Sequence, residues 1–317
     1  GCSPARPTPL TAPTPSPETA RPRGSTPTPA PTPAPTPAPT PTPAPVPTPT
    51  PTPPTAAFVC PDEFPRVSPP NLPPSPSRNN IIFGTNGVDT LVGSANTDSI
   101  FGLGEADLIF GQQGGDYING NTGNDTVYGG KENNTLFGGK GFDLVFGDRA
   151  SDSLYGNRGN DSLSGNDGDD QMFGGKADDV ILGGAGRDLL SGDGGNDTLC
   201  GGDDNNSLTG GAGDDLLFGG TSDDLLFGDL GSDTLLGGDG RDGFLLAPAT
   251  GVDTIIDFTP GFDLLVLLDD LQFSQLSLTQ TNGATAISIA STNEVLAVLA
   301  GVRPNQLSAA DFTTLQI

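Results

Sequence analysis

The chain has 317 residues, a formal net charge of -26 and no histidine. The lack of histidine excludes zinc sites of the H-E-x-x-H type and catalytic triads built on histidine, and the strong negative charge argues against nucleic acid as a partner. No apolar run approaches the roughly 18 residues that a membrane-spanning helix needs. The sequence therefore predicts neither such an enzyme nor a transmembrane segment.

Proline divides the chain into parts. Of the 32 prolines, 29 lie before residue 81, and residues 81–247 contain none. We predict a disordered Pro/Thr/Ala-rich spacer over residues 1–57, because alternation of proline with threonine or alanine favours an extended polyproline II chain. Residues 58–80 are predicted to form a Pro-rich connector or an N-terminal cap.

The three cysteines do not make a disulfide framework. Gly1-Cys2 resembles the end of a bacterial lipoprotein signal, in which the cysteine carries a lipid anchor. The alternative for Cys2 is a free or disulfide-bonded cysteine, with Cys60 as a candidate partner. Cys200 is predicted to be a lone thiol that points outward from a strand.

Residues 84–245 repeat every nine residues without insertion or deletion. Each unit has glycine at position 1 (Gly84 through Gly237), Asp or Asn at position 6 and an apolar side chain at position 8. The acid positions from 89 to 242 span 153 residues, which is 17 steps of nine and therefore 18 units. The repeat resembles the G-G-x-G-x-D-x-U-x nonapeptide of the RTX, or hemolysin-type, calcium-binding family, and the resemblance covers about half of the chain.

Each unit divides into a turn and a strand. Positions 1–6 are predicted to be turn residues, since glycine allows backbone angles that a Cβ forbids. Positions 7–9 are predicted to be a short strand whose position 8 points inward. Two units make one coil, and successive coils pair in parallel. The predicted fold is all-β: a parallel β-roll of 18 units over residues 81–245, about nine coils and roughly 40 Å long at about 4.8 Å per coil.

Stacking places the acids of alternate units above one another in two columns. Such carboxylates repel by several kcal/mol unless a divalent ion lies between them. Calcium suits this site, because it accepts six to eight oxygens from carboxylates and carbonyls, whereas magnesium demands a small octahedron. The predicted ligands of column one are Asp89, Asp107, Asp125, Asp143, Asp161, Asp179, Asp197, Asp215 and Asp233. Those of column two are Asp98, Asp116, Asn134, Asp152, Asp170, Asp188, Asn206, Asp224 and Asp242.

The two columns are not equivalent in sequence. Both asparagines fall in column two. Position 4 departs from glycine in column one only at Glu105 and Ala177, but in column two at Asn96, Glu132, Ala150, Asp204 and Ser222. We therefore predict fewer or weaker calcium sites in column two. A turn preference of Asp and Asn without metal is the alternative interpretation, but it explains neither the strict period nor the glycine that begins each unit.

Aromatic residues recur at position 9. They are predicted to point outward and to stack in ladders on the two sheets, and the alternative is a dedicated partner surface. These residues are Phe101, Phe110, Tyr128, Phe137, Phe146, Tyr155, Phe173, Phe218 and Phe227.

Residues 246–317 are predicted to form a small C-terminal β cap, with strands over 284–290 and 294–300 and a turn at Asn282-Gly283. Residues 253–266 resemble the D-x-I-x-D-F-x-x-G-x-D segment that follows many RTX arrays, a serralysin-like end-piece, so Asp253, Asp257 and Asp263 are candidates for one further ion. Residues 311–317 resemble the export region that type I secretion machinery recognises in this family. A lipoprotein leader would imply a different export route, so the two resemblances conflict.

The sequence predicts an extracellular or cell-surface calcium-binding protein, not an enzyme, whose roll folds when calcium neutralises the acid columns. One alternative is an adhesin or surface-layer component that binds cell-surface components through its outer aromatic face, with calcium only structural. Another is a fragment of an enzyme whose catalytic domain precedes Gly1.

Overall fold

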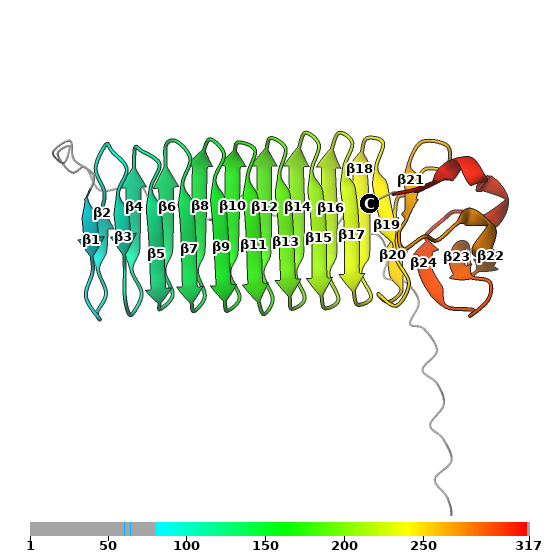
Figure 1. The fold of residues 1–317 in the computed structure, drawn as a ribbon, viewed down its shortest axis with the longest axis horizontal. Coiled ribbons are helices and arrows are strands. Elements are labelled where there is room, and N and C mark those ends of the chain that lie inside the picture. The colour runs from blue at the N-terminus through cyan, green and yellow to red at the C-terminus, as the bar shows by residue number, and fades with distance from the viewer. Residues whose placement is uncertain (1–59, 61–63, 65–79, 316–317) are drawn as a thin grey trace, which may run out of the picture. The chain divides into compact units, whose positions relative to one another are not determined.

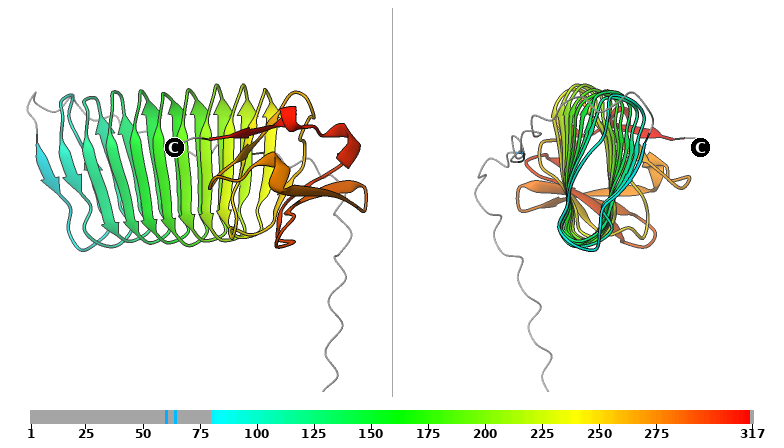
Figure 2. Two further views of the ribbon diagram at one scale, coloured as in Figure 1. Left: turned by 45° about the vertical axis from the view of Figure 1, so that its right-hand side comes forward. Right: turned by 90° about the vertical axis from the view of Figure 1, so that its left-hand side faces the viewer.

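The computed structural model describes Cys60, Phe64 and residues 80–315. The predictions for the spacer over residues 1–57 and for Cys2 lie outside the described residues. Within the described part, the repeats build a parallel β-roll in which the chain alternates between two sheets (Figure 1). Viewed along its axis, the roll is a stack of flattened coils (Figure 2). The predicted all-β fold is confirmed.

In the described part of the chain, the first sheet has twelve strands. In spatial order they are β1 (Ile81–Phe83), β3 (Ser99–Phe101), β5 (Tyr117–Thr122), β7 (Thr135–Lys140), β9 (Ser153–Arg158), β11 (Gln171–Lys176), β13 (Leu189–Gly194), β15 (Ser207–Ala212), β17 (Leu225–Leu230), β19 (Gly243–Leu246), β21 (Leu264–Leu267) and β25 (Phe312–Thr314).

The second sheet has thirteen strands among the residues that the structure describes. They are β2 (Thr90–Val92), β4 (Leu108–Gln112), β6 (Thr126–Gly130), β8 (Leu144–Arg149), β10 (Ser162–Asp167), β12 (Val180–Ala185), β14 (Thr198–Asp203), β16 (Leu216–Thr221), β18 (Thr234–Asp239), β20 (Asp253–Ile255), β24 (Val295–Leu299), β23 (Ala284–Ile289) and β22 (Leu276–Thr281). The strands β2 to β19 correspond one to one with the 18 repeat units.

The core lies between the two sheets and is built from position 8. Because the period is nine, each residue pairs with the residue 18 positions on in the next coil, as Leu163 does with Ile181. The position 8 side chains from Ile100 to Phe244 are at most 1% exposed and form one continuous cluster. One apolar side chain per unit therefore suffices, because stacking turns isolated side chains into an unbroken core.

The strands are longer than the sequence predicted. A typical unit, such as β8, extends from position 7 through positions 1, 2 and 3 of the next unit and covers six residues. Only positions 4 to 6 make the turn. The prediction that positions 1–6 form the turn was wrong, because backbones at positions 1 to 3 also pair with the neighbouring coil despite their glycine content.

Aromatic ladders form on both sheets, as predicted, but the two outer faces differ. On the first sheet, rings stack from Phe83 to Phe173 with centroids 4.8–5.8 Å apart. Tyr117, from position 7, takes the rung that Asn119 leaves empty. On the second sheet, Phe110, Tyr128 and Phe146 stack at 4.8–5.1 Å, but these rings are buried rather than exposed.

Phe64 and Cys60 explain this burial. Phe64 packs edge-on against Phe146 with ring centroids 6.4 Å apart, and Cys60 forms a disulfide with Cys200 on β14. Two predictions are thereby corrected: Cys200 is not a lone thiol, and Cys60 does not pair with Cys2. The cysteine at position 9 faces outward, as expected, but Cys60 and Phe64 lie against that face.

The C-terminal part continues the roll before it closes it. Strands β20 and β21 add to the two sheets in parallel, and β24 and β25 add to them in turn. The antiparallel strands β22, β23 and β24 then form the predicted cap (Figure 1). Asn282 and Gly283 have positive φ angles of 39° and 88° in the β22–β23 hairpin. Three short 3-10 helices complete the end piece: η1 (Phe273–Gln275), η2 (Pro304–Gln306) and η3 (Ala309–Asp311).

Candidate calcium-binding columns

The position 6 acids form two buried hydrogen-bonded ladders. Of the 18 predicted ligands, all except Asp89 are buried. The backbone N–H of each acid donates to Oδ1 of the acid one coil further on, as from Asp143 to Asp161 at 2.8 Å. Asp143 and Asp161 belong to column one, in the turns from the first sheet to the second, and the same bond links Asp152 to Asp170 in column two at 2.7 Å. One carboxylate oxygen per aspartate is thus satisfied by the protein itself.

The second oxygen, Oδ2, is held against the glycine at position 1 of the same unit. A Cβ built on Gly165 would lie 2.1 Å from Oδ2 of Asp170 and 2.8 Å from the carbonyl oxygen of Gly183 in the next coil. Gly165 lies inside strand β10 and is buried. The invariant glycine is therefore required by the close approach of a carboxylate and a neighbouring backbone, and not by turn geometry as predicted.

Most of these Oδ2 atoms are buried without a hydrogen-bond donor. Buried polar groups are normally paired, so a repeated orphan acceptor indicates a missing positively charged partner. The thirteen aspartates concerned are Asp107, Asp116, Asp125, Asp143, Asp152, Asp161, Asp170, Asp179, Asp188, Asp197, Asp215, Asp224 and Asp233.

The two asparagines of column two show which group lies opposite the second side-chain atom of a column residue. In Asn134 and Asn206 the Oδ1 atom accepts from the preceding coil as in aspartate, from Asp116 at 2.9 Å and Asp188 at 3.0 Å. The Nδ2 group lies against the position 1 glycine, where aspartate has Oδ2. It donates to the position 4 carbonyl of its own turn, that of Glu132 at 2.8 Å or Asp204 at 3.0 Å. The position 4 carbonyl therefore faces a positively polarised group in these units.

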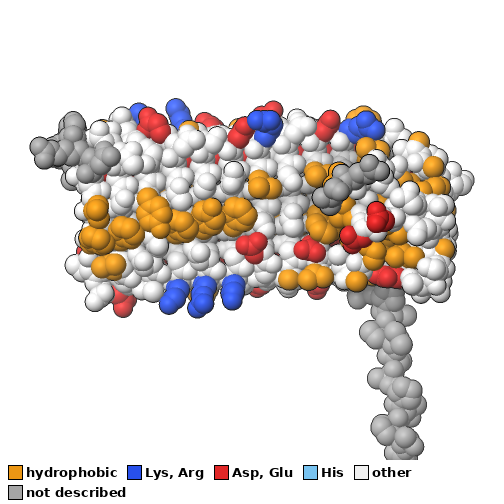
Figure 3. Space-filling view, viewed as in Figure 1, with side chains coloured by type: hydrophobic (Ala, Val, Ile, Leu, Met, Phe, Trp, Pro, Cys, Tyr) orange, Lys and Arg blue, Asp and Glu red, His pale blue; other side chains and the backbone are white. Residues whose placement is uncertain are grey.

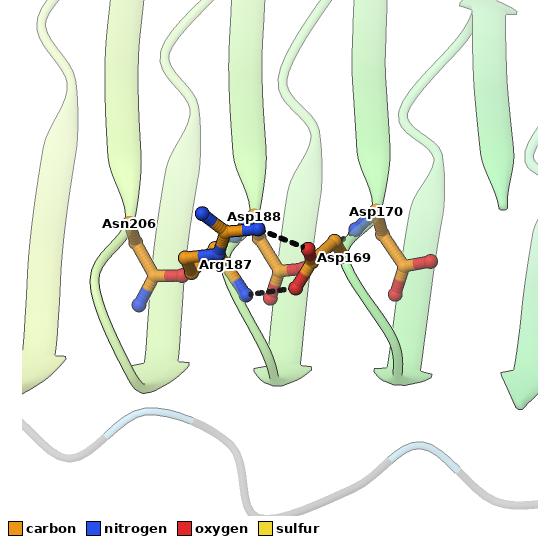
Figure 4. Close-up of polar contacts among 5 residues, drawn as sticks. All are labelled: Asp169, Asp170, Arg187, Asp188 and Asn206. Carbon is orange, nitrogen blue, oxygen red and sulfur yellow. Dashed lines mark hydrogen bonds and ion pairs between the residues drawn. The ribbon is translucent and has the colours of Figure 1, made fainter. Parts of the chain in front are cut away.

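Figure 4 shows this arrangement in column two, where Asp170, Asp188 and Asn206 follow one another in successive coils. The exposed pair Asp169 and Arg187 lies beside the column, with Nη2 of Arg187 2.7 Å from Oδ2 of Asp169. The ion pair is separate from the buried carboxylates, because Asp169 occupies position 5 and not position 6 of its unit.

Burial has a large effect on the acidity of the columns. Burial raises the pKa of Asp143 and Asp179 to about 8. A hydrogen bond from a backbone amide lowers the pKa of each carboxyl, and the neighbouring carboxylates raise it. The pKa of Asp116 and Asp152 in column two is raised to about 7 for the same main reason. Near neutral pH, a calcium-free roll therefore keeps protons on part of its columns.

The first unit of each column differs from the rest. Oδ2 of Asp89 accepts from the backbone N–H of Thr85 at 2.6 Å, and Oδ2 of Asp98 accepts from that of Ser94 at 2.6 Å. Oδ2 of these two carboxylates has a backbone donor, unlike Oδ2 of the thirteen aspartates from Asp107 to Asp233. The sequence gave one sign of this difference: position 2 is Thr85 in the first unit and Ser94 in the second.

Position 4 also distinguishes the columns. From Glu105 onward it has positive φ in every repeat, a conformation that costs about 1–2 kcal/mol for residues other than glycine. Column two carries this strain at Glu132, Ala150, Asp204 and Ser222, and column one at Glu105 and Ala177. At position 2, however, non-glycine residues with positive φ number five in column one and three in column two. Backbone strain therefore does not rank the columns, and weaker calcium sites in column two stay a prediction.

The three acids of the end piece do not form one cluster. Asp253 extends column one by accepting from Asp233 N–H at 3.3 Å, and Asp263 extends column two by accepting from Asp242 N–H at 3.1 Å. Asp257 accepts instead from the amides of Gly237 and Gly238. The structure therefore does not bring these residues together at a single ion, because each turn continues a different column.

The residues present fit calcium. Among the described residues no group of three or more acidic, histidine or cysteine side chains converges on one point, so an ion held in a column must take backbone carbonyls together with carboxylates. Calcium accepts this mixed oxygen set at flexible geometry. The fold and the site thus define a β-roll with two columns of buried carboxylates whose orphan oxygens suit a divalent ion.

The comparison with known families agrees. The RTX calcium-binding nonapeptide repeat matches residues 77–109, 110–145, 146–181, 173–208 and 209–244, more than half of the chain. The chain belongs to the RTX calcium-binding repeat family, and its repeats bind calcium ions. No curated protein sequence matches it.

Among solved structures, the chain is similar to the extracellular lipase LipA from Serratia marcescens, with 16% sequence identity and a TM-score of 0.30. The match covers 71% of this chain and 40% of the lipase chain. The chain thus spans less than half the length of the lipase, and a similarity at this level says nothing about activity. In the part of the chain that the structure describes, no helix is long and apolar enough to cross a membrane.

Proposed function

We propose that the protein is a secreted or cell-surface calcium-dependent folding module, in which the position 6 aspartates are the calcium ligands. The repeated orphan Oδ2 is the observation that carries this proposal. In asparagine units an amide donor fills the place opposite the position 4 carbonyl. In aspartate units the Oδ2 atom takes the place of that amide donor, so two acceptors, Oδ2 and the position 4 carbonyl oxygen, face each other. Only a proton or a metal ion between them makes this arrangement favourable.

Calcium would then couple binding to folding. Without ions, the chain must either protonate or expose its column aspartates, and a glycine-rich chain loses much conformational entropy on ordering. With ions, the binding free energy becomes folding free energy. We expect column one to fill more completely than column two, and the second and later coils to bind more tightly than the Asp89 and Asp98 units.

The disulfide supports an extracellular location, since such bonds persist in oxidising compartments. Cys60 and Cys200 are 140 residues apart in sequence and join the connector to the roll. Calcium at extracellular concentrations lies in the range that weak modules use, about 0.1–1 mM. The type I export region and the lipid anchor at Cys2 remain the two alternative interpretations of the route.

We infer a non-catalytic role for the roll, because its buried carboxylates are engaged in the ladders. The structure gives less support than the sequence did to the alternative of an adhesin that binds a partner through its outer aromatic face. On the first sheet, Phe137, Tyr155 and Phe173 stack at interplanar angles of 11° and 8°, so these rings cover one another's faces. Tyr117 is tilted by 46° and 45° against its two neighbours. A sugar that stacks on an aromatic face finds few faces free within the ladder.

Far-ultraviolet circular dichroism of the full chain during a calcium titration tests the proposal, with magnesium as control. We expect a cooperative gain of β structure at roughly 0.1–1 mM calcium and none with magnesium. A β spectrum that is identical in chelator and in calcium would refute calcium-coupled folding. Isothermal titration calorimetry of the same sample counts the ions and compares the number with the thirteen orphan carboxylates.

A further inference from the structure

Two residues of column two interrupt its row of buried carboxylates. In column one, the orphan Oδ2 atoms belong to eight consecutive aspartates. In column two, Asn134 and Asn206 divide them into groups of one, three and one. The groups are Asp116 alone, then Asp152, Asp170 and Asp188, then Asp224.

The side chain of Asn134 is satisfied by the protein itself. Its Oδ1 accepts from Asp116 N–H at 2.9 Å, and its backbone N–H donates to Oδ1 of Asp152 at 2.6 Å. Its Nδ2 donates to the carbonyl of Glu132 at 2.8 Å. Because Oδ1 faces an N–H group and Nδ2 faces a carbonyl oxygen, the chemistry of the partners fixes the orientation of this amide.

The Asn206 turn repeats the arrangement. Its Oδ1 accepts from Asp188 N–H at 3.0 Å (Figure 4), and its backbone N–H donates to Oδ1 of Asp224 at 2.7 Å. Its Nδ2 donates to the carbonyls of Asp203 and Asp204 at 3.3 and 3.0 Å. Each asparagine turn therefore has an amide donor in place of the orphan Oδ2, and links its coil to both neighbouring coils by hydrogen bonds.

Both asparagine units carry an acid at position 4 instead. Glu132 and Asp204 occupy this position and are exposed, whereas Glu105 is the only acid at position 4 of the aspartate units. The Oε2 atom of Glu132 also accepts from Gly114 N–H in the preceding coil at 2.6 Å. Acidic side chains lie exposed along both long edges of the face in Figure 3, whereas the column carboxylates are buried. The charge of the asparagine units thus lies in solvent, where it needs no buried counter-ion.

We propose that Asn134 and Asn206 are calcium-independent joints, which link neighbouring coils without an ion and divide column two into three separate calcium-binding segments. The inference rests on the proposed calcium function and names the two places in column two where an ion is absent. In an aspartate turn, a cation would lie between Oδ2 and the position 4 carbonyl. In these two turns the Nδ2 hydrogens occupy that place, and calcium, which takes oxygen ligands, would meet the positive end of the amide dipole.

The test compares two double variants of the full chain. N134D/N206D restores an aspartate to both turns. N133D/N205D is the matched control, because it adds the same two charges to the same two turns at the adjacent position 5, where both asparagines are exposed. Equilibrium dialysis followed by atomic absorption counts the calcium bound per chain at saturation. Urea unfolding in chelator, with a stabilising osmolyte present, measures the contribution of the joints without calcium.

We expect N134D/N206D to bind one more ion for each restored aspartate, and N133D/N205D to bind as many ions as wild type. In chelator, N134D/N206D should unfold at a lower urea concentration than N133D/N205D, because each restored aspartate lacks the amide donor. The inference is overturned if N134D/N206D binds no more calcium than the control, or if it is equally stable in chelator. If wild-type protein binds no calcium, the folding module fails instead, and the comparison in chelator alone decides whether the asparagines link the coils.

Discussion

Substitution of Asp215 by asparagine separates the two roles of a column carboxylate. Asp215 lies in column one, its Oδ1 accepts from Asp197 N–H at 2.7 Å, and its Oδ2 is a buried orphan. Burial raises its pKa to about 7. In D215N the Oδ1 bond is retained, while Nδ2 is placed to donate to the Gly213 carbonyl, as Asn134 does to the carbonyl of Glu132.

The structure predicts opposite effects with and without calcium. An unsatisfied buried acceptor costs about 1–3 kcal/mol, so D215N should raise the free energy of unfolding of the calcium-free roll by about that amount. Each 1.4 kcal/mol is about tenfold in the folded-to-unfolded ratio. In calcium the variant has lost a charged ligand, so more calcium should be needed to reach the folding midpoint.

The assay is circular dichroism at fixed pH, first in chelator and then through a calcium titration. D239N is the matched control, because Asp239 is an exposed carboxylate outside the columns. If D215N lowers the β content in chelator, or if it shifts the calcium midpoint no more than D239N, the assignment of Oδ2 as the calcium-facing atom is wrong.

Three further outcomes are expected. Because the pKa values of Asp143 and Asp179 rise from 3.8 in the unfolded chain to about 8 in the fold, the calcium-free roll holds excess protons between these values. Its stability should be greatest below pH 4 and fall as the pH rises to 8, whereas calcium affinity should rise; circular dichroism in metal-stripped buffer at pH 5 and pH 8 checks this, and an unchanged signal would contradict it. Replacing Cys60 or Cys200 with serine should cost about 2–4 kcal/mol and expose the second-sheet ladder, measured as a lower melting temperature and increased dye binding, with a reductant as the parallel treatment. The substitution Gly165→Ala should destabilise the roll by about 1–3 kcal/mol through overpacking, since its Cβ would lie 2.1 Å from a column carboxylate oxygen; urea unfolding in calcium that matches wild type would refute the close approach.

The nine-residue period was sufficient to predict the sheet register and the core. A strict period forces residue i onto residue i+18, so the inward position 8, as in Leu163, follows directly from alternation along the strand. The same logic placed the aspartates in two columns. What the period could not give was the length of the strands, because glycine suggests a turn even where Gly165 lies within a paired strand.

The features that sequence missed depend on contacts across long separations. The bond between Cys60 and Cys200 joins residues 140 apart, and nothing in the repeat marks Cys200 as covered. The different environment of Asp89 arises because its turn begins the roll and Thr85 is free to donate to Oδ2. The separation of Asp253 from Asp263 follows from the irregular turns after β19, where the spacing within a column changes to 20 and 21 residues.

The amide-to-carboxylate bonds give the roll a polarity. Each aspartate side chain supports the backbone of the coil before it, so that Asp125 N–H depends on Asp143, and Asp143 N–H on Asp161. The C-terminal end is closed by the cap, while Ile81 and Phe83 at the other end are 71% and 63% exposed. In a one-dimensional stack with nearest-neighbour coupling, opening should begin at β1 and advance coil by coil, so amide hydrogen exchange would slow progressively toward the cap.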